Sequence, residues 1–557
     1  MQRNLRQLAS KEYDVLVIGG GITGACIAHD AALRGLSVAL VEKNDFGACT
    51  SSASSKLLHG GIRYLPKGQV WKVRESAREQ AIFQGIAPHL TRWLPFLIPT
   101  DNSALAKGAP AMKAAMLVYS LCCAGLSGLI RDPGKKPPSR TFLPPEQACQ
   151  EAPLLSSIQG LTGAQVLYES HMHSSERMTL AFCKTAVKNG ADLANYVEVM
   201  DLLAAGESVR GARVRDRIGD EEFEIRARLV INSAGPFVQA VNQSVPGLRL
   251  HHRLTGFSRG VHLVTRQLEP DFALALTTRK KTEGFITRGG RHFFIIPWRG
   301  RSLIGTTNVP IEGRLEDIRV TKKDIDDFLA DINESLPDVK LSLSDVHYAF
   351  TGIYPIIARE IKPDTYQGTG EFQIVDHAKK DGISGIITAL GAKFTTARHV
   401  AARAVDLAGD RLGRKTAPCA TASTPLLEGA IDDVQRFRDS CRTAYGDLLT
   451  PELIDHLIRN HGAEIDQLVS MGKSMNALEQ ICADRKTLTV EIIYAVEEEM
   501  ARTLEDVVFR RTGLGTIGHP GAEALQRCLA VMADILGWDE DEQQRQLAAV
   551  EARYRYA

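Results

Sequence analysis

Residues 14–24 read Asp-Val-Leu-Val-Ile-Gly-Gly-Gly-Ile-Thr-Gly, and this run decides the fold. The apolar residues 15–18 predict a strand that is buried on both faces. The turn that follows has the spacing G-x-G-x-x-G, with Gly19, Gly21 and Gly24 at its glycine positions. The first glycine permits a tight bend, the second lets a pyrophosphate approach the backbone, and the third lets the next helix pack closely against the strand.

The residues after this turn complete a strand–turn–helix–strand unit. The turn is followed by a predicted helix with a small-residue packing face, and residues 38–41 predict the second strand. The packing face consists of Ala25, Ala28, Ala31, Ala32 and Leu33. The free N–H groups and the positive dipole end of this helix would face a bound pyrophosphate. Glu42 ends the second strand, where a carboxylate can accept both ribose hydroxyls of an adenosine. The sequence therefore predicts an α/β domain that binds a dinucleotide.

Length, charge and cysteine content narrow the class of protein. A chain of 557 residues is too long for one core, so two or three domains are expected. The formal net charge of +1 supplies no field that would attract nucleic acid. The ten cysteines have no C-x-x-C spacing, so we expect no metal site and a reducing compartment. The first predicted strand begins near residue 13, which leaves no room for a secretory signal and predicts a cytoplasmic protein.

Residues 114–130 form an apolar run that complicates a purely cytoplasmic interpretation. The run has no charged residue over seventeen positions and is flanked by Lys113 and Arg131. It is shorter than the roughly 20 apolar residues that cross a bilayer, and it contains serine and glycine. Two interpretations stay open: a buried helix, or a helix that rests on a membrane surface.

Another predicted strand indicates that the dinucleotide is FAD rather than NAD. Residues 229–236 read Leu-Val-Ile-Asn-Ser-Ala-Gly-Pro, a hydrophobic strand that ends in a turn of small residues. In flavoproteins such a strand returns beneath the adenosine half of the cofactor, and Ala234 and Gly235 are small enough for that approach. The distance of this strand from the opening motif favours FAD.

Residues 50–65 read Thr-Ser-Ser-Ala-Ser-Ser-Lys-Leu-Leu-His-Gly-Gly-Ile-Arg-Tyr-Leu. This stretch closely resembles the signature of the FAD-dependent glycerol-3-phosphate dehydrogenases. The resemblance covers nearly the whole chain through Ile296-Pro-Trp298, Ile304-Gly-Thr-Thr-Asn308, Thr351-Gly-Ile-Tyr-Pro355, Gly391-Ala-Lys-Phe-Thr-Thr-Ala-Arg398 and Arg510-Arg-Thr-Gly-Leu-Gly515.

This resemblance implies a fold, a cofactor and a reaction. The fold would be a glutathione-reductase-like, Rossmann-type FAD-binding domain with an inserted β-rich substrate domain and a C-terminal helical cap. Members of the family oxidise glycerol 3-phosphate to dihydroxyacetone phosphate by hydride transfer to flavin N5. They pass the electrons to a membrane quinone, or in some members to oxygen. A quinone acceptor implies peripheral contact with the inner face of the cytoplasmic membrane; a homo-oligomer stays open.

The resemblance also implies the site residues. The residues expected to bind FAD are Gly19, Gly21, Ile22, Thr23, Gly24, Glu42, Lys43, Thr50, Ser51, Ser52, Ser54, Ser55, Lys56, Leu58, His59, Gly60, Ala234, Gly235, Gly391, Lys393, Phe394 and Thr395. The residues expected to act on the substrate are His59, Arg63, Tyr64, His262, Tyr354 and Lys393.

The chain departs from the family pattern where the substrate phosphate would bind. Tyr354 stands at the position of one family arginine, and Gly370 aligns with a second. Ala392 replaces a glycine next to the flavin. Guanidinium groups match phosphate oxygens, so the departure puts the substrate in doubt. Two alternatives follow: the same flavoprotein acting on another polyol phosphate, a hydroxy acid or an amine, or a flavin redox sensor that is not an enzyme.

The patterns also predict how the domains are divided. The FAD-binding domain is expected in three pieces, residues 13–75, 160–250 and 345–415, and the substrate domain in two, residues 76–159 and 251–344. Residues 418–429 contain threonine, serine and proline and are typical of a linker. The helical patterns that follow predict a C-terminal helical domain over residues 425–557.

Overall fold

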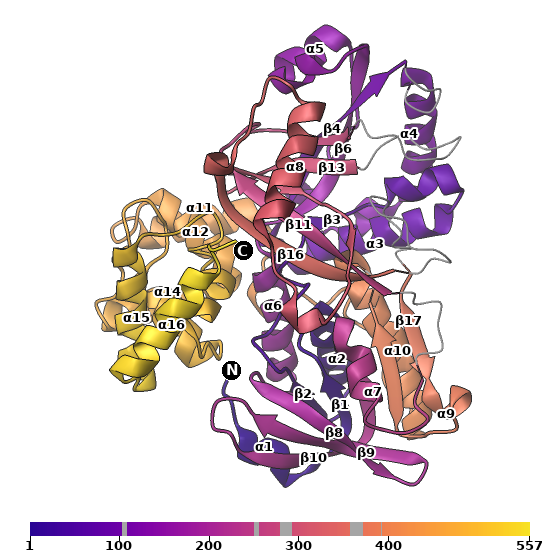
Figure 1. The fold of residues 1–557 in the computed structure, drawn as a ribbon, viewed down its shortest axis with the longest axis vertical. Coiled ribbons are helices and arrows are strands. Elements are labelled where there is room, and N and C mark those ends of the chain that lie inside the picture. The colour runs from indigo at the N-terminus through magenta and orange to yellow at the C-terminus, as the bar shows by residue number, and fades with distance from the viewer. Residues whose placement is uncertain (103–107, 250–255, 279–291, 357–370, 392, 557) are drawn as a thin grey trace.

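Two β-sheets and a group of C-terminal helices make up the structure, a computed structural model that describes residues 1–102, 108–249, 256–278, 292–356, 371–391 and 393–556. In Figure 1 the first sheet lies at the bottom, the second sheet lies above it, and the C-terminal helices stand to one side. The architecture expected from the sequence, an α/β domain with an added β-rich domain and a helical cap, is therefore confirmed.

The first sheet holds the glycine turn. Its order is β17-β18-β10-β1-β2-β7, and β8 and β9 are joined to it through β10. The strands β1, β2, β10 and β18 run parallel, so their carboxyl ends meet at one edge. The bounds are β1 (Glu12–Ile18), β2 (Val38–Val41), β7 (Asp192–Ala194), β8 (Val197–Ala205), β9 (Ser208–Asp216), β10 (Glu222–Asn232), β17 (Gln373–Asp376) and β18 (Ile386–Leu390).

Helices cover one face of this sheet, and strands with short helices cover the other. On the first face α2 lies between α6 and α10, where its alanines let the neighbouring helices approach (Figure 1). On the second face β8 and β9 pack with α1 and α7. The helices of this part are α1 (Leu5–Ser10), α2 (Ile22–Leu33), α6 (Ser175–Lys188), α7 (Val238–Asn242), α9 (His377–Lys380) and α10 (Ala397–Leu412).

The second sheet is largely antiparallel and runs in the order β15-β11-β14-β13-β12-β4-β6-β3, with β16 paired to β11 and β5 to β6. One face packs against α8, and the other packs against the cap. Its elements are β3 (Leu57–Leu58), β4 (Thr91–Asp101), β5 (Phe142–Leu143), β6 (Leu161–Met172), β11 (Gly256–Thr265), β12 (Ala273–Thr277), β13 (His292–Trp298), β14 (Arg301–Gly305), β15 (Val309–Pro310), β16 (Val346–Ile356), α3 (Val70–Ile86), α4 (Ala109–Cys123), α5 (Pro145–Glu151) and α8 (Lys322–Ser335).

Three strands differ from the division expected from the sequence. β3, β6 and β16 lie in stretches assigned to the FAD-binding domain, but they pair within the second sheet. The physical reason is that an apolar run shows that a strand is buried, not which neighbours its backbone pairs with. The chain therefore crosses between the two sheets more often than the motifs indicated.

The apolar run 114–130 folds as most of α4 followed by a short helical turn, Leu126–Leu129. Met112, Met116 and Tyr119 are buried, whereas Leu117 and Leu121 are 65% and 67% exposed. One face of the helix is therefore buried and the other exposed, and contact with a membrane surface stays a prediction. In the described part of the chain, no helix combines the length and the apolar character needed to cross a bilayer.

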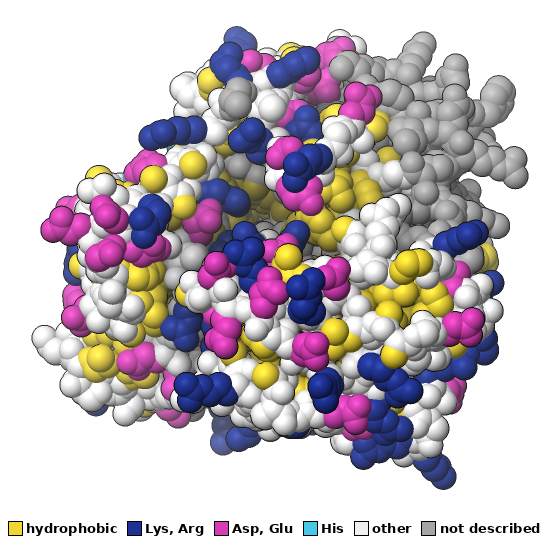
Figure 2. Space-filling view, turned by 60° about the horizontal axis from the view of Figure 1, so that its bottom comes forward, with side chains coloured by type: hydrophobic (Ala, Val, Ile, Leu, Met, Phe, Trp, Pro, Cys, Tyr) yellow, Lys and Arg dark blue, Asp and Glu magenta, His cyan; other side chains and the backbone are white. Residues whose placement is uncertain are grey.

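The cap consists of α11 (Val434–Tyr445), α12 (Pro451–His461), α13 (Ile465–Ser474), α14 (Thr489–Glu498), a π-helical turn (Asp506–Arg511), α15 (Ala522–Leu536) and α16 (Glu540–Ala552). These helices share an apolar core of their own and add a second apolar contact with the sheet. On the face drawn in Figure 2, basic and acidic side chains are interspersed, in keeping with the net charge of +1.

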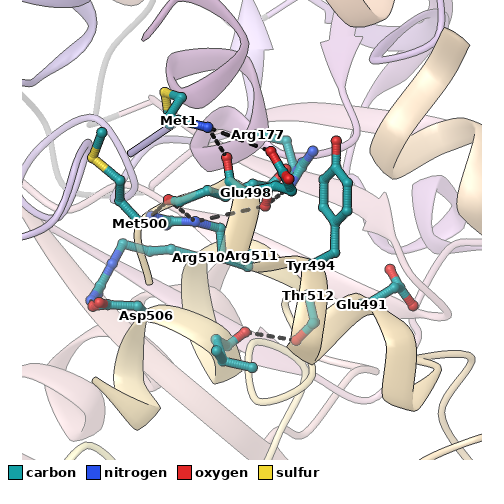
Figure 3. A network of polar contacts seen from close by, with 12 residues as sticks. Met1, Arg177, Glu491, Tyr494, Glu498, Met500, Asp506, Arg510, Arg511 and Thr512 are labelled. Carbon is teal, nitrogen blue, oxygen red and sulfur yellow. Dashed lines mark hydrogen bonds and ion pairs between the residues drawn. The ribbon is translucent and has the colours of Figure 1, made fainter. Parts of the chain in front are cut away.

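Buried ion pairs join the cap to α6, and Figure 3 shows Arg177 beside residues of the cap. Arg177 on α6 donates to both carboxylate oxygens of Glu499, at 2.8 and 2.7 Å, and to Glu428 Oε1 at 2.7 Å. Lys184, two turns further along α6, donates to the same two carboxylates at 3.1 and 2.8 Å. The cations come from the first domain and the carboxylates from the cap region, so neither set is paired unless the two parts dock.

A second buried cluster ties the cap to the loop after β2. The Asp45 carboxylate accepts hydrogen bonds from Arg510 at 2.8 Å and from Arg511 at 2.6 and 2.8 Å. Burial raises the pKa of Asp45, but the two guanidinium groups outweigh burial and lower it to about 2. The two arginines open the last motif of the sequence resemblance, and their role here is to hold the domains together.

We expect Asp45→Asn to lower the free energy of unfolding by about 3–5 kcal/mol, because it leaves buried guanidinium groups without their counter-charge. Since the pKa of Asp45 is lowered in the folded state, the stabilisation is present above its ordinary value of 3.8 and is lost as the pH falls toward about 2. Urea unfolding of wild type and variant at pH 7 and at low pH measures both effects. Asp201→Asn, at an exposed ion pair, serves as the control and should change stability by less than about 1 kcal/mol. Equal stability of Asp45→Asn and wild type at pH 7 would contradict the assignment.

Candidate active site

The main cavity opens at the carboxyl edge of the first sheet and extends to the second sheet. Its volume is about 640 Å³. From the first domain it is lined by the turns after β1, β2, β10 and β18, and from the second by residues of β11 and β16. Parallel strands bring their ends to one edge, so turns that are far apart in the sequence meet here.

The glycine turn forms one wall with backbone rather than side chains. Gly19 has φ +101°, and a Cβ there would lie 2.8 Å from Ser233 O. A Cβ at Gly24 would lie 1.9 Å from Gly19 O, so this residue allows helix and strand to touch and does not itself line the cavity. The helix α2 begins at Ile22 with Gly21 as its N-cap and has no capping side chain. Its N-terminal end therefore faces the cavity, which suits an anion such as a pyrophosphate.

Glu42 is held at the adjacent wall by two backbone groups. Its carboxylate accepts a hydrogen bond from Gly20 N at 2.7 Å and from Asn44 N at 2.9 Å. Burial raises the pKa of this carboxyl, and the two backbone N–H groups oppose that effect. Lys43 lines the cavity as well, with its ammonium 3.5 Å from the ring centroid of Phe237.

The serine-rich loop connects the two sheets. Thr50 Oγ1 donates to Ile353 O at 2.8 Å, which ties the loop to β16. Ser55 Oγ and His262 Nε2 share a hydrogen bond of 2.9 Å, which ties it to β11. Ser51 Oγ accepts from Ile22 N at 2.9 Å and so links the loop to α2.

Five of the residues expected to bind FAD lie off the main cavity. They are Gly24, Ser52, Lys56, Leu58 and Gly60. The Lys56 ammonium points into a buried ion pair with Glu176 at 2.5 Å, and Leu58 is fully buried in the core. A lysine inside a serine-rich motif suggests a phosphate ligand, but its partner lies 120 positions further along the chain, where the motif carries no information.

The remaining expected FAD-binding residues line the cavity. Besides those already described, they are Thr23, Ser54, His59, Ala234, Gly235, Gly391, Lys393, Phe394 and Thr395. The sequence did not single out Ser76, Phe237, Thr306 and Gly352, which also line it. Ser76 lies on α3 and Phe237 follows the strand motif 229–236, so only the fold could identify them. Thr306 and Gly352 lie within quoted motifs, but the motifs did not show that these two positions face the cavity.

A cationic corner of the cavity joins Arg63, Tyr64 and Lys393. Arg63 Nη2 donates to Tyr64 Oη at 3.0 Å, and the Lys393 ammonium lies 4.9 Å from the centroid of the Tyr64 ring. Lys393 also donates to Ser76 Oγ at 2.9 Å. Burial, together with the neighbouring Arg63, lowers the pKa of Lys393 to about 8. Two cations held this close suit an anionic group on the substrate.

Two histidines line the cavity in their neutral form. Burial lowers the pKa of His59 to about 3, with smaller contributions from Arg63 and Lys393. Burial and Lys56 lower the pKa of His262 to about 3. The His262 ring stacks on Phe350 with centroids 5.0 Å apart and an interplanar angle of 10°. At pH 7 both imidazoles are unprotonated, and either is able to accept a proton.

Tyr354, which the resemblance places at a family arginine position, makes a neutral contact. Its hydroxyl is hydrogen-bonded to Asn308 Oδ1, which also accepts from Ser258 Oγ at 2.9 Å. Tyr354 lines the cavity, so the polar group at this position is a phenol and not a cation. Gly370 and Ala392 lie outside the described residues.

Two family models match the chain. Residues 14–407 match the family described as FAD dependent oxidoreductase, and residues 419–543 match the C-terminal domain of alpha-glycerophosphate oxidase. Together they span both sheets and most of the cap.

Relatives match over nearly the full length. The glycerol-3-phosphate dehydrogenase of Synechocystis sp. is 31% identical, with 98% of this chain and 97% of the relative covered. The aerobic glycerol-3-phosphate dehydrogenase of Bacillus subtilis is 32% identical, with 92% and 89% covered. The crystal structure of the glycerol-3-phosphate dehydrogenase from Bacillus halodurans complexed with FAD superposes with a TM-score of 0.76 at 28% identity, covering 98% of this chain and 95% of that one.

We expect Gly21→Val to lose bound FAD. A Cβ at Gly21 would lie 3.2 Å from Ser51 Oγ, and the added methyl groups would occupy the place where a pyrophosphate meets the backbone. Flavin content per protein, from absorbance after release by heat, measures the loss. Gly128→Val is the matched control, because a Cβ at Gly128 meets no atom within 4 Å. A folded Gly21→Val protein with a full complement of flavin would refute the assigned turn.

Proposed function

The chain belongs to the FAD-dependent oxidoreductases, within the glycerol-3-phosphate dehydrogenase family, and from this premise we propose that it oxidises glycerol 3-phosphate to dihydroxyacetone phosphate and passes the electrons to a membrane quinone. The observation that carries the proposal is one cavity that combines a dinucleotide turn with a cationic corner and two neutral histidines.

The residues of the main cavity fit FAD. The glycine turn leaves room at the N-terminus of α2 for the pyrophosphate, and Glu42 lies where the adenosine ribose would be. The serine loop, Gly391 and residues 393–395 would hold the flavin half. When bound, FAD supplies the acceptor for the hydride that leaves the secondary alcohol carbon.

The chain's own residues would bind the substrate and take its proton. Arg63 and Lys393 would bind the phosphate as fixed cations. The neutral imidazole of His262 would accept the hydroxyl proton as the alcohol becomes a ketone, and Ser55 holds that ring in place. The imidazolium so formed is disfavoured by burial, so the proton would have to leave before the next turnover.

Tyr354 supports a second candidate, the same chemistry on a different substrate. A phenol bound to Asn308 supplies no positive charge, whereas the family places a guanidinium there. Charge-assisted hydrogen bonds contribute about 1.5–3 kcal/mol each, so phosphate affinity in the family pose would be lower. Another polyol phosphate, a hydroxy acid or an amine is the alternative substrate class.

An exposed apolar patch supports the membrane acceptor. It consists of Trp71 on α3 together with Leu117, Val118, Leu121 and Leu129 on and after α4. The two helices are joined here because Arg74 donates to Cys122 O at 2.9 Å. Residues 108–131 contain no acidic residue and carry Lys113 and Arg131. An apolar patch with cations at its margin suits the surface of an anionic membrane, where a quinone resides.

We expect the protein with bound FAD to reduce a dye acceptor slowly with glycerol 3-phosphate, and Tyr354→Arg to raise kcat/KM by about 10- to 150-fold, the effect of one charge-assisted hydrogen bond. Steady-state turnover and bleaching of the flavin by a panel of alcohols and amines measure this. Tyr354→Phe, which removes the hydroxyl without adding charge, should give no gain.

The remaining outcomes of this experiment separate the candidates. Fast turnover by wild type without a gain from Tyr354→Arg would assign the phosphate to Arg63 and Lys393. Bleaching by another compound in the panel, with no turnover of glycerol 3-phosphate by either protein, would overturn the proposed substrate. Failure of every compound to bleach the flavin would favour a redox sensor.

We expect Leu117→Glu/Leu121→Glu to abolish co-sedimentation with vesicles of phosphatidylglycerol and phosphatidylethanolamine. Both side chains are more than three-fifths exposed, so the protein should still fold. Leu343→Glu, at an exposed leucine before β16, is the control and should leave vesicle binding unchanged. Equal vesicle binding by the double variant and the wild type would show that the patch is not the contact.

A further inference from the structure

A second cavity, called here the cationic cavity, lies between the second sheet and the cap. Its volume is about 660 Å³, similar to that of the main cavity. The sheet contributes the start of β4, the end of β6 and the turn between β13 and β14; the cap contributes α11, α12 and residues 484–487 and 512–514. Among the described residues the two cavities have no lining residue in common.

Positive charge dominates the lining of this cavity. Seven lysine and arginine side chains line it, against one carboxylate, that of Asp484. That carboxylate is already paired with Arg485 at 2.6 Å and is 67% exposed. Asp455, just behind the wall, is shared among three guanidinium groups: Arg442 at 3.0 Å, Arg438 at 3.2 Å and Arg459 at 3.9 Å. Counting the lining and Asp455, positive charges outnumber carboxylates; the two other carboxylates that act on Arg299 are themselves paired, Glu176 with Lys56 and Glu491 with His456.

Buried polar atoms of the lining have no protein partner. Neither His171 Nε2 nor Arg299 Nε has a hydrogen-bond partner among the described residues, and both atoms are shielded from solvent. His171 is 2% exposed. Buried polar groups in native proteins are normally hydrogen-bonded, so these two atoms are exceptions in the wall of the cavity.

The β13–β14 turn places Arg299 in the cavity at a conformational cost. Arg299 has φ +53°, and Gly300 beyond it has φ +73°. In such a two-residue hairpin turn the first position favours asparagine, aspartate or glycine, and an arginine there is strained. The side chain is then anchored by its Nη1, which donates to Gly513 O at 3.1 Å and Thr516 Oγ1 at 3.2 Å. The strained backbone of this turn therefore holds the Arg299 guanidinium in a fixed position.

Like charges repel one another within the cavity. Burial and the nearby Arg459 lower the pKa of Arg92. Burial lowers the pKa of Arg299 to about 10 against the opposing effect of Glu176 and Glu491, and that of Lys135 to about 8 against Asp132, with smaller contributions from Arg459 and Arg438. Like charges that crowd together in a buried site are costly unless an anion occupies it.

We propose that the cationic cavity binds a small organic or inorganic polyphosphate, an anion with at least two linked phosphate groups. Guanidinium groups bind phosphate oxygens in pairs, and Arg92, Arg299 and Arg459 approach the cavity from three different elements. Three of the seven cations pair with Asp455 or Asp484, and an anion with two phosphate groups would be shared by the other four, Arg92, Lys135, Arg299 and Lys486. The volume is within the range of sites for small ligands. Binding at the cationic cavity does not depend on which substrate the main cavity takes.

Calorimetric titration of the full-length protein with its FAD bound tests the proposal, with pyrophosphate, ADP and inorganic phosphate as probes. We expect saturable binding of pyrophosphate at one site per chain, with a Kd that is at least about 10-fold lower than that of inorganic phosphate. Arg459→Gln, at a side chain that is 47% exposed, and Arg299→Gln should each weaken pyrophosphate binding by about 10-fold or more. Binding of ADP as tightly as pyrophosphate would extend the ligand class to nucleotides.

Two controls keep the test decisive. Arg442→Gln removes a guanidinium that pairs with the same Asp455 but does not line the cavity, and it should leave the Kd unchanged. Lys393→Met alters the main cavity and should also leave it unchanged. No saturable pyrophosphate binding to the wild type, a loss in Arg442→Gln equal to that in Arg459→Gln, or a loss in Lys393→Met would overturn the proposal.

Discussion

The close approach of α2 to the turn after β1 is the constraint on which the rest of the structure depends. A Cβ at Gly24 would lie 1.9 Å from Gly19 O, and a Cβ at Gly19 would lie 2.8 Å from Ser233 O. Backbone therefore meets backbone with no side chain between, and glycine is required at both positions. Because of this contact the N-terminus of α2 opens at the edge where β1, β2, β10 and β18 end, and the main cavity forms there.

The two ends of the main cavity differ in charge for a structural reason. One end presents backbone N–H groups and the Glu42 carboxylate, which suit a dinucleotide. At the other end the serine loop holds the first domain against β11 and β16 through Thr50 and Ser55. That contact buries His262 and lowers its pKa to about 3, whereas burial lowers the pKa of Lys393 only to about 8. A neutral proton acceptor and a cation therefore coexist in one site because the lysine starts from a much higher ordinary pKa.

At the boundary between the cap and the rest of the protein, some buried cations are compensated by carboxylates and others only in part. Arg177 and Lys184 meet carboxylates from the cap region, so their charge is compensated within the protein. At the cationic cavity three guanidinium groups share Asp455, and polar atoms of His171 and Arg299 lack partners among the described residues. The first arrangement joins domains. The second has the electrostatics of a binding site and sits on the same boundary.

The sequence by itself determined the elements whose cause is local. The residues 14–42 specified strand, turn, helix and second strand, because the period of apolar residues and the glycine spacing are properties of neighbouring residues. The motif residues also indicated which turns belong together, and most of the expected site residues line one cavity.

Tertiary structure alone decided what depends on distant partners: that Lys56 pairs with Glu176, that β6 and β16 join the second sheet, and that Arg510 and Arg511 hold Asp45. It also decided that one face of α4 is exposed and that arginines from separate elements surround a second cavity. Ion pairs and sheet pairing join residues that are far apart in the sequence, so the spacing of residues along the chain does not reveal them.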